Sequence, residues 1–109
     1  MPRLEELPII RYETTIGIGK GISIPQKGYR YGTPKKHYDL SWTIISEHYV
    51  ITEELKTSRK RDTFPVEVYD LNVGEDSVDK RCLQLLKTKL VEWGVDKEQV
   101  ESAANRYSR

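Results

Sequence analysis

The sequence has almost no cysteine, and this scarcity excludes several classes of protein. Cys82 is the single cysteine among 109 residues, so neither an internal disulfide nor a cysteine-rich zinc site can form. A reducing compartment is therefore expected. The sequence also lacks an apolar run near the roughly 18 residues that a membrane span needs, and no apolar segment follows a basic start as in a secretion signal. We expect a cytoplasmic protein that does not contact a membrane.

Motifs for nucleotide binding and metal binding are also missing. Gly17, Gly19 and Gly21 are spaced by two residues, which matches neither a phosphate-binding P-loop nor a dinucleotide fingerprint. Glycines at this spacing indicate a bulge, a bend or the close approach of another backbone. His37 and His48 are the only histidines and the cysteine is far from both in sequence, so the spacing of a metal site is absent. We expect neither a metal nor a cofactor.

One catalytic arrangement is permitted by residue type, a site resembling that of a ribonuclease. Glu47 or His48 would act as the base, His37 as the acid, and Lys35 or Arg30 would hold the phosphate. Adjacent residues on a strand point to opposite faces, so only one of the two candidate bases could join the acid. A surface histidine and a histidine in a solvated loop are the simpler interpretation, which makes an enzyme the less favoured class.

Acidic residues are missing from one long stretch and cations from another, although the net charge is only +1. Residues 14–38 contain five lysines or arginines and no acid, and residues 56–61 contain four more cations. Residues 62–79 contain six acids and no base. Such segregation creates a local electric field that the total charge conceals.

The spacing of the apolar residues that are present predicts a strand-rich region over residues 8–73. In segments 10–18 and 38–44, apolar side chains alternate with polar ones, which is the period of a strand with one buried face. A further strand is predicted over 64–73. Consecutive strands with polar connections indicate a meander.

Two irregularities and one long loop are predicted within this region. The alternation changes phase near Ile45 and again between Val68 and Tyr69, which we attribute to bends or bulges. A short strand is expected to end at Pro25. Segment 26–36 is rich in glycine and cations and is expected to form a polar loop.

The apolar period changes in the last third of the chain and predicts two helices at about 77–93 and 97–107. Asp76 is placed to cap the first helix. Gly94 has the position of a left-handed residue that follows a helix, and Asp96 has the position of an N-cap for the second helix. A helical hairpin with a tight turn is therefore expected.

These elements predict a single domain over residues 1–109 of the α+β class. An antiparallel β-meander of about four strands is followed by a C-terminal helical hairpin packed on one face of the sheet. Trp42 and Trp93 fall on the apolar phase of their elements, so we expect both as core anchors. Cys82 is expected to be a small buried hydrophobic residue rather than a nucleophile.

Two basic segments with interspersed tyrosines form the candidate binding surface. Cations neutralise phosphates and release counterions, while aromatic rings stack on unpaired bases. If both segments lie at the same end of the sheet, they form one cleft with about seven to nine cations. The predicted nucleic-acid-binding residues are Lys20, Lys27, Tyr29, Arg30, Tyr31, Lys35, Lys36, Arg59, Lys60 and Arg61.

Two functions from different classes stay open at this stage. The first is a small non-enzymatic protein that binds single-stranded DNA or RNA through these loops. The second is a protein–protein interaction module, such as an inhibitor, an adaptor or an assembly subunit, or a homo-oligomer in which segment 62–79 meets the basic loops of another copy. The pI of 7.8 lies below the value above about 9 expected of a dedicated nucleic-acid domain, which keeps the second function open. Short chains without enzymatic motifs are common among viral and mobile-element proteins, an origin that this chain fits.

Overall fold

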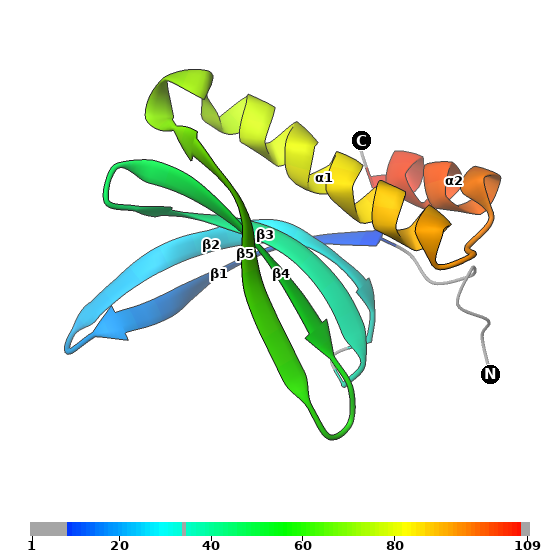
Figure 1. Cartoon of the computed structure of the whole chain (residues 1–109), viewed down its shortest axis with the longest axis horizontal. Coiled ribbons are helices and arrows are strands. Elements are labelled where there is room, and N and C mark those ends of the chain that lie inside the picture. Colours follow the sequence, from blue (N-terminus) through cyan, green and yellow to red (C-terminus); the bar gives the residue numbers. More distant parts are fainter. Residues whose placement is uncertain (1–8, 34, 108–109) are drawn as a thin grey trace.

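The computed structural model describes residues 9–33 and 35–107, which form a five-stranded antiparallel sheet with helices on one face (Figure 1). The strands are β1 (Ile9–Gly19), β2 (Ile22–Gly32), β3 (His37–Ile45), β4 (His48–Lys56) and β5 (Arg61–Asp70). The 3-10 helix η2 (Leu71–Val73) and helices α1 (Glu75–Glu92) and α2 (Lys97–Tyr107) follow. Each strand pairs with the next along the chain, so the predicted α+β meander is confirmed, with five strands instead of about four. None of the described helices is long and apolar enough to cross a membrane.

Strand β2 is longer than the predicted short strand, because it includes much of the segment that was expected to form a loop. Strand β2 continues through Pro25 to Gly32, so the prediction of a loop over 26–36 is wrong. Pro25 pairs with Thr15 of β1, whereas pairing with β3 begins only at Lys27. At Pro25 the strand therefore has a neighbour on one side only, which is where a residue without an N–H group is tolerated.

The phase change near Ile45 is a hairpin turn and not a bulge in a continuous strand. Ile45 pairs with His48, and the two residues between them, Ser46 and Glu47, have φ angles of 51° and 62°. Positive φ at both central positions defines the tight turn that matches the twist of two antiparallel strands. Neither residue is glycine or asparagine, the residues that usually signal such a turn, and this is why the sequence did not reveal it.

Strand β5 is an outer strand of the sheet, and it contains a bulge. Thr52 of β4 pairs with Pro65, whereas the neighbouring Ile51 pairs with Glu67, so Val66 is the extra residue. The predicted phase change between Val68 and Tyr69 thus lies a few residues too late. A proline and a bulge on an outer strand discourage its pairing with other chains.

The core lies between one face of the sheet and the helices. Helix α1 packs mainly on β2 and β3, and α2 reaches β1. Each fully buried aliphatic side chain stabilises the fold by roughly 1.5–3 kcal/mol. The buried core residues are Ile9, Tyr29, Tyr31, Tyr38, Leu40, Trp42, Tyr49 and Ile51 from the sheet, and Val78, Cys82, Leu86, Leu90, Val95 and Val100 from the helical hairpin.

Two of the three residues predicted for the core are buried as expected. Trp42 is almost completely buried, and burial raises the pKa of the Cys82 thiol, which keeps it in the unreactive protonated form. Trp93 differs from the prediction, because 51% of its surface is exposed. It follows the last turn of α1 and rests edge-on against Tyr38, with 4.8 Å between the ring centroids.

The helical hairpin is formed by the capping residues that the sequence contains. Gly94 has a φ of 93°, and its N–H donates to the carbonyl oxygen of Val91. The N–H of Val95 donates to the carbonyl oxygen of Leu90, and the donor–acceptor distance is 3.0 Å in both bonds. This pair of bonds is the Schellman motif. Asp96 accepts the N–H of Glu98 at 2.7 Å and caps α2. The first helix begins at Glu75, before the predicted start, and no side chain caps it there.

Candidate nucleic-acid interface

The strand register places two basic turns at the same end of the sheet. Gly32 pairs with His37, His37 with Lys56, and Lys56 with Arg61, so the ends of four strands form one row. The β2–β3 turn and the β4–β5 turn therefore lie near each other (Figure 1). We call the cations of these turns the basic rim: Lys35, Lys36, Arg59, Lys60 and Arg61.

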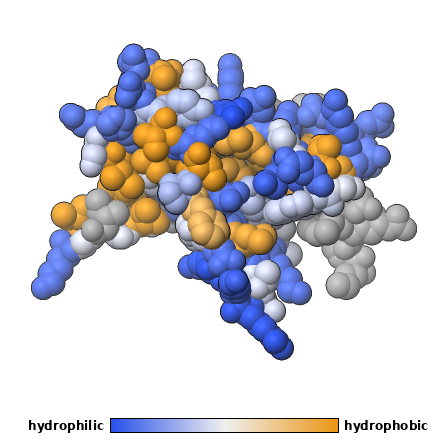
Figure 2. Space-filling model, in the orientation of Figure 1, coloured by the Kyte–Doolittle hydropathy of each residue, from blue (hydrophilic) through white to orange (hydrophobic). Residues whose placement is uncertain are grey.

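The cations of the basic rim are exposed and only weakly neutralised. Lys60 and Arg61 have side-chain exposures of 72% and 60%, and their nearest carboxylates are Asp62 at 3.6 Å and Glu54 at 3.8 Å. Such exposed pairs contribute little, because water screens them. Within residues 9–33 and 35–107, the structure shows no ion pair for the other three rim cations. The tip of the β4–β5 hairpin forms a hydrophilic projection (Figure 2).

Three of the eight predicted cations, Lys20, Lys27 and Arg30, lie away from the basic rim. Lys20 is in the β1–β2 turn, at the opposite end of the sheet from the basic rim. Lys27 lies on the helix-covered side, 3.4 Å from a carboxylate oxygen of Glu75 and 5.6 Å from the centroid of the Trp42 ring. The structure thus brings five of the predicted cations together at one end, and not the seven to nine of a single large cleft.

The two predicted stacking tyrosines lie in the core and not in a loop. Tyr29 and Tyr31 have 5% and 6% of their surfaces exposed, and the Tyr29 hydroxyl donates to Asp79 of α1. The physical reason is the continuation of β2, whose alternation turns both rings toward the helices and Arg30 toward the opposite face. Their ring faces are not exposed for stacking on a base.

Arg30 is held in a polar cluster on the face of the sheet away from the helices. Its Nε and one terminal nitrogen each lie 3.0 Å from an oxygen of Asp39, which is buried on the neighbouring strand. The guanidinium also lies over the ring of Tyr12, whose hydroxyl donates to the same carboxylate at 3.2 Å. Burial, followed by the nearby Asp39 charge, raises the pKa of Tyr12. Arg30 is therefore engaged in the fold and not directed at solvent.

A glycine lets this polar cluster form. Gly28 lies between Tyr12 on one strand and Ser41 on the other. A Cβ atom at this position would collide with the carbonyl oxygen of Leu40 and the backbone of Ser41. Strands β2 and β3 approach closely at Gly28. Because Gly28 has no side chain, the Tyr12 hydroxyl can reach Asp39 across this position.

His37 is part of the same cluster and not in a solvated loop, so that expectation is wrong. Its side chain is 2% exposed, with Nδ1 3.0 Å from the carbonyl oxygen of Thr33 and Nε2 2.8 Å from a carboxylate oxygen of Glu54. Both ring nitrogens thus lie within hydrogen-bond distance of an oxygen atom of the protein. Sequence reasoning missed this cluster, because its members become neighbours only through the register of four strands.

His37, Asp39 and Glu54 are residue types that can hold a metal ion, and their ligand atoms lie within 4.8 Å of one another. However, Asp39 already accepts hydrogen bonds from Arg30 and Tyr12. The Arg30 guanidinium also lies beside the Asp39 carboxylate, in the position that a metal ion would need. The arrangement is therefore that of a hydrogen-bonded network within the fold.

The residues of the ribonuclease-like arrangement do not meet. His37 and Ile45 are at opposite ends of β3, and His48 pairs with Ile45. With a rise of about 3.3 Å per residue, the two histidines are separated by roughly 25 Å along the strand. They cannot reach one scissile bond together.

A pocket of about 230 Å³ opens beside the basic rim, between the end of α1 and strands β3 and β4. Trp93 and Tyr38 form its aromatic side. We call it the rim pocket. Its lining residues include Tyr31, Lys36, His37, Tyr38, Leu55, Lys56, Leu90, Trp93 and Val95.

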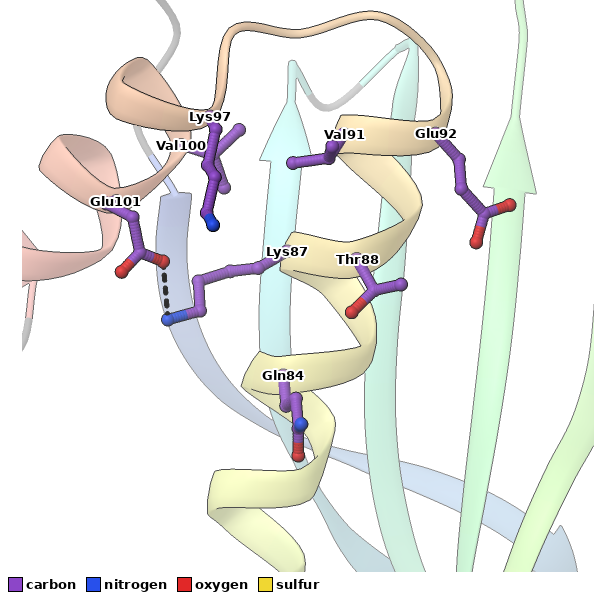
Figure 3. Close-up of a pocket in the computed structure, with 8 residues that line it drawn as sticks. All are labelled: Gln84, Lys87, Thr88, Val91, Glu92, Lys97, Val100 and Glu101. Atoms are coloured by element: carbon purple, nitrogen blue, oxygen red, sulfur yellow. Dashed lines mark ion pairs between the residues drawn. The ribbon is translucent and has the colours of Figure 1, made fainter.

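A larger groove of about 470 Å³ separates α1 from α2. Figure 3 shows Val91 and Val100 directed toward each other across it. Lys87 reaches from α1 to Glu101 of α2, and the two charges form an ion pair at 2.8 Å. The groove thus has no excess of one charge that would favour an ionic ligand.

Comparisons with known proteins gave no relative: no family model, no curated protein and no solved structure showed a significant match to this chain.

Proposed function

We propose that the protein is a small, non-enzymatic nucleic-acid-binding protein that contacts phosphates through the basic rim. The observation that carries this proposal is the convergence of five cations on one end of the sheet, by the pairing of Gly32, His37, Lys56 and Arg61. Cations that neutralise phosphates release condensed counterions, which drives binding to any sequence. A base-reading element is not required for such binding.

The contacts of the acidic segment, residues 62–79, favour this proposal over self-association driven by charge. Five of its six acids lie beside a basic side chain within the chain, and Glu67 and Asp79 form partly buried pairs with arginines. The pairs are Asp62 with Lys60, Glu67 with Arg81, Asp70 with His48, Glu75 with Lys27, and Asp79 with Arg11. Part of the acidic segment is therefore engaged within the fold, whereas the rim stays exposed.

The proposal is tested by the anisotropy of a fluorescent single-stranded oligonucleotide titrated with protein at several salt concentrations. We expect the logarithm of the affinity to fall linearly with the logarithm of the salt concentration, by about 0.7 for each phosphate contacted. Changing Arg59→Ala together with Lys60→Ala removes two rim cations, so affinity falls and the salt slope becomes shallower. Absence of binding to single-stranded DNA, RNA and duplex at low salt refutes the proposal.

The matched control removes the same charge from another place. Lys20 and Lys80 are exposed, in the β1–β2 turn and on α1 respectively. Lys20→Ala with Lys80→Ala should leave affinity and salt slope nearly unchanged. If this control weakens binding as much as the rim variant does, net charge and not the basic rim governs the interaction.

A second candidate function, association with a protein or with another copy of this chain, is favoured by a different observation. Phe64, Val66 and Val68 of β5 are 54%, 42% and 58% exposed, and Figure 2 shows apolar side chains gathered around β5 and the start of α1. Exposed apolar patches of this kind mark interaction surfaces. Light scattering over a range of concentrations tests it: a mass that rises with concentration supports self-association, and a constant monomer mass argues against it.

A further inference from the structure

We infer that an unpaired nucleobase of the bound strand enters the rim pocket and stacks on Trp93, so that the protein selects single strands over duplex. This inference rests on the proposed function and adds the class of nucleic acid to it. It uses an aromatic residue that the candidate site from the sequence did not contain, in place of Tyr29 and Tyr31.

Trp93 has the exposure and support that a stacking residue needs. About half of its surface is accessible to solvent, while Tyr38 braces the ring edge-on at an interplanar angle of 70°. The backbone at this position is fixed by the Schellman bonds of Gly94 and Val95. A ring held in this way loses little conformational freedom when a base stacks on it.

The rim pocket also combines apolar walls with positive charge. Leu55, Leu90 and Val95 provide apolar surface, while Lys36 and Lys56 lie at the same pocket. Lys36 belongs to both the pocket and the basic rim, so a strand whose phosphates follow the rim passes the mouth of the pocket. Nonspecific single-strand sites combine a cationic track with an aromatic platform in this way.

The size of the rim pocket fits one base and not a larger ligand. Its volume of about 230 Å³ is below the roughly 300 Å³ at which pockets for drug-sized ligands begin. The bases of a duplex are stacked and paired, so they reach such a pocket only after the energetic cost of unpairing. A single strand presents its bases without that cost, which is the origin of the expected selectivity.

The test compares a labelled oligothymidine with a duplex of equal length, using wild-type protein and Trp93→Ala. We expect the wild type to bind the single strand more tightly. Trp93→Ala should weaken single-strand binding about 5- to 150-fold, the range that corresponds to one stacked base. Duplex affinity and the salt slope should be unchanged, because the phosphate contacts remain.

Two further variants serve as controls. Val91→Ala shortens a similarly exposed apolar side chain of α1 that lines the groove between the helices and not the rim pocket, and it should bind like wild type. Trp93→Phe keeps an aromatic ring and should restore most of the affinity, which separates stacking from damage to the fold.

The outcomes distinguish the inference from the function on which it rests. If wild type binds and Trp93→Ala binds single strands equally well, the inference fails while the basic rim proposal stands. Equal wild-type affinity for single strands and duplex also overturns the inference. If the wild type binds neither nucleic acid, both proposals fail together.

Discussion

At the scale of single residues, the pair formed by Arg30 and Asp39 has the largest expected effect on stability. The Asp39 side chain is 3% exposed and that of Arg30 is 29% exposed. The carboxylate depends on its partner, since an ionised group without a partner in such surroundings is strongly disfavoured. The guanidinium, in contrast, retains some contact with water.

Removal of the arginine should therefore cost more than neutralisation of the aspartate. Arg30→Met removes the guanidinium and leaves the buried Asp39 with only the Tyr12 hydroxyl and His37 beside it. We expect the free energy of unfolding to fall by about 3–5 kcal/mol. Asp39→Asn keeps the shape and leaves a partly hydrated arginine, so a loss of about 1–3 kcal/mol is expected. Urea unfolding measures both. An equal or smaller loss for Arg30→Met would show that the cluster tolerates the unpaired carboxylate.

At the scale of secondary-structure elements, local signals predicted the helices and the meander, but not the boundary between β3 and β4 or the length of β2. Gly94 and Asp96 act on residues near them in sequence, so the helical hairpin could be predicted from the chain alone. The turn at Ser46 and Glu47 lacks the usual turn residues, which concealed the boundary between β3 and β4. The burial of Tyr29 depends on pairing with distant strands, and no local pattern records it.

The β3–β4 turn provides a stability test at this scale. Glu47 has a φ of 62°, a left-handed conformation that costs a residue with a Cβ atom about 1–2 kcal/mol. Glu47→Gly should relieve part of this cost and raise the free energy of unfolding by about 0.5–1 kcal/mol, measured by urea unfolding. Gly94→Ala, at a φ of 93°, should have the opposite effect. Destabilisation by Glu47→Gly would mean that the Glu47 side chain contributes more than its conformation costs.

An ion pair between Glu67 and Arg81 joins β5 to α1 and makes this contact sensitive to acid. The Arg81 guanidinium lies 2.6 Å from a carboxylate oxygen of Glu67, and this hydrogen bond lowers the pKa of Glu67 from 4.5 to about 2. A lowered pKa in the folded state stabilises the fold above about pH 4.5, and this contribution is lost as the pH falls toward 2. Both side chains are partly exposed, so water screening keeps the contribution modest.

Unfolding by urea at a series of pH values tests this contact. The wild-type protein should lose stability between about pH 4.5 and 2. In Arg81→Met the Glu67 pKa returns toward its ordinary value, so this part of the pH dependence should disappear. An unchanged pH profile in the variant would assign the acid sensitivity to other carboxyl groups.

At the scale of the whole molecule, the meander converts a segregated sequence into a polarised surface. Turns that are separated by two strands in sequence return to the same end of the sheet, which brings Thr33, Lys35 and Lys36 next to residues 57–60. The net charge of +1 conceals this polarity, because most acids of segment 62–79 are paired internally. The sequence predicted a larger set of cations for the binding surface, and only the order and register of the strands determine which of these cations lie together.

The most direct test of the basic rim is to map the contact surface by NMR, following backbone amide shifts as a short single-stranded oligonucleotide is added. We predict that the largest shifts occur in Thr33, Lys35, Lys36 and residues 57–61, with smaller ones near Trp93. Residues 19–22 and 45–48, in the turns at the opposite end of the sheet, should stay unchanged. Shifts concentrated at that opposite end, with none in the two basic turns, would contradict the account.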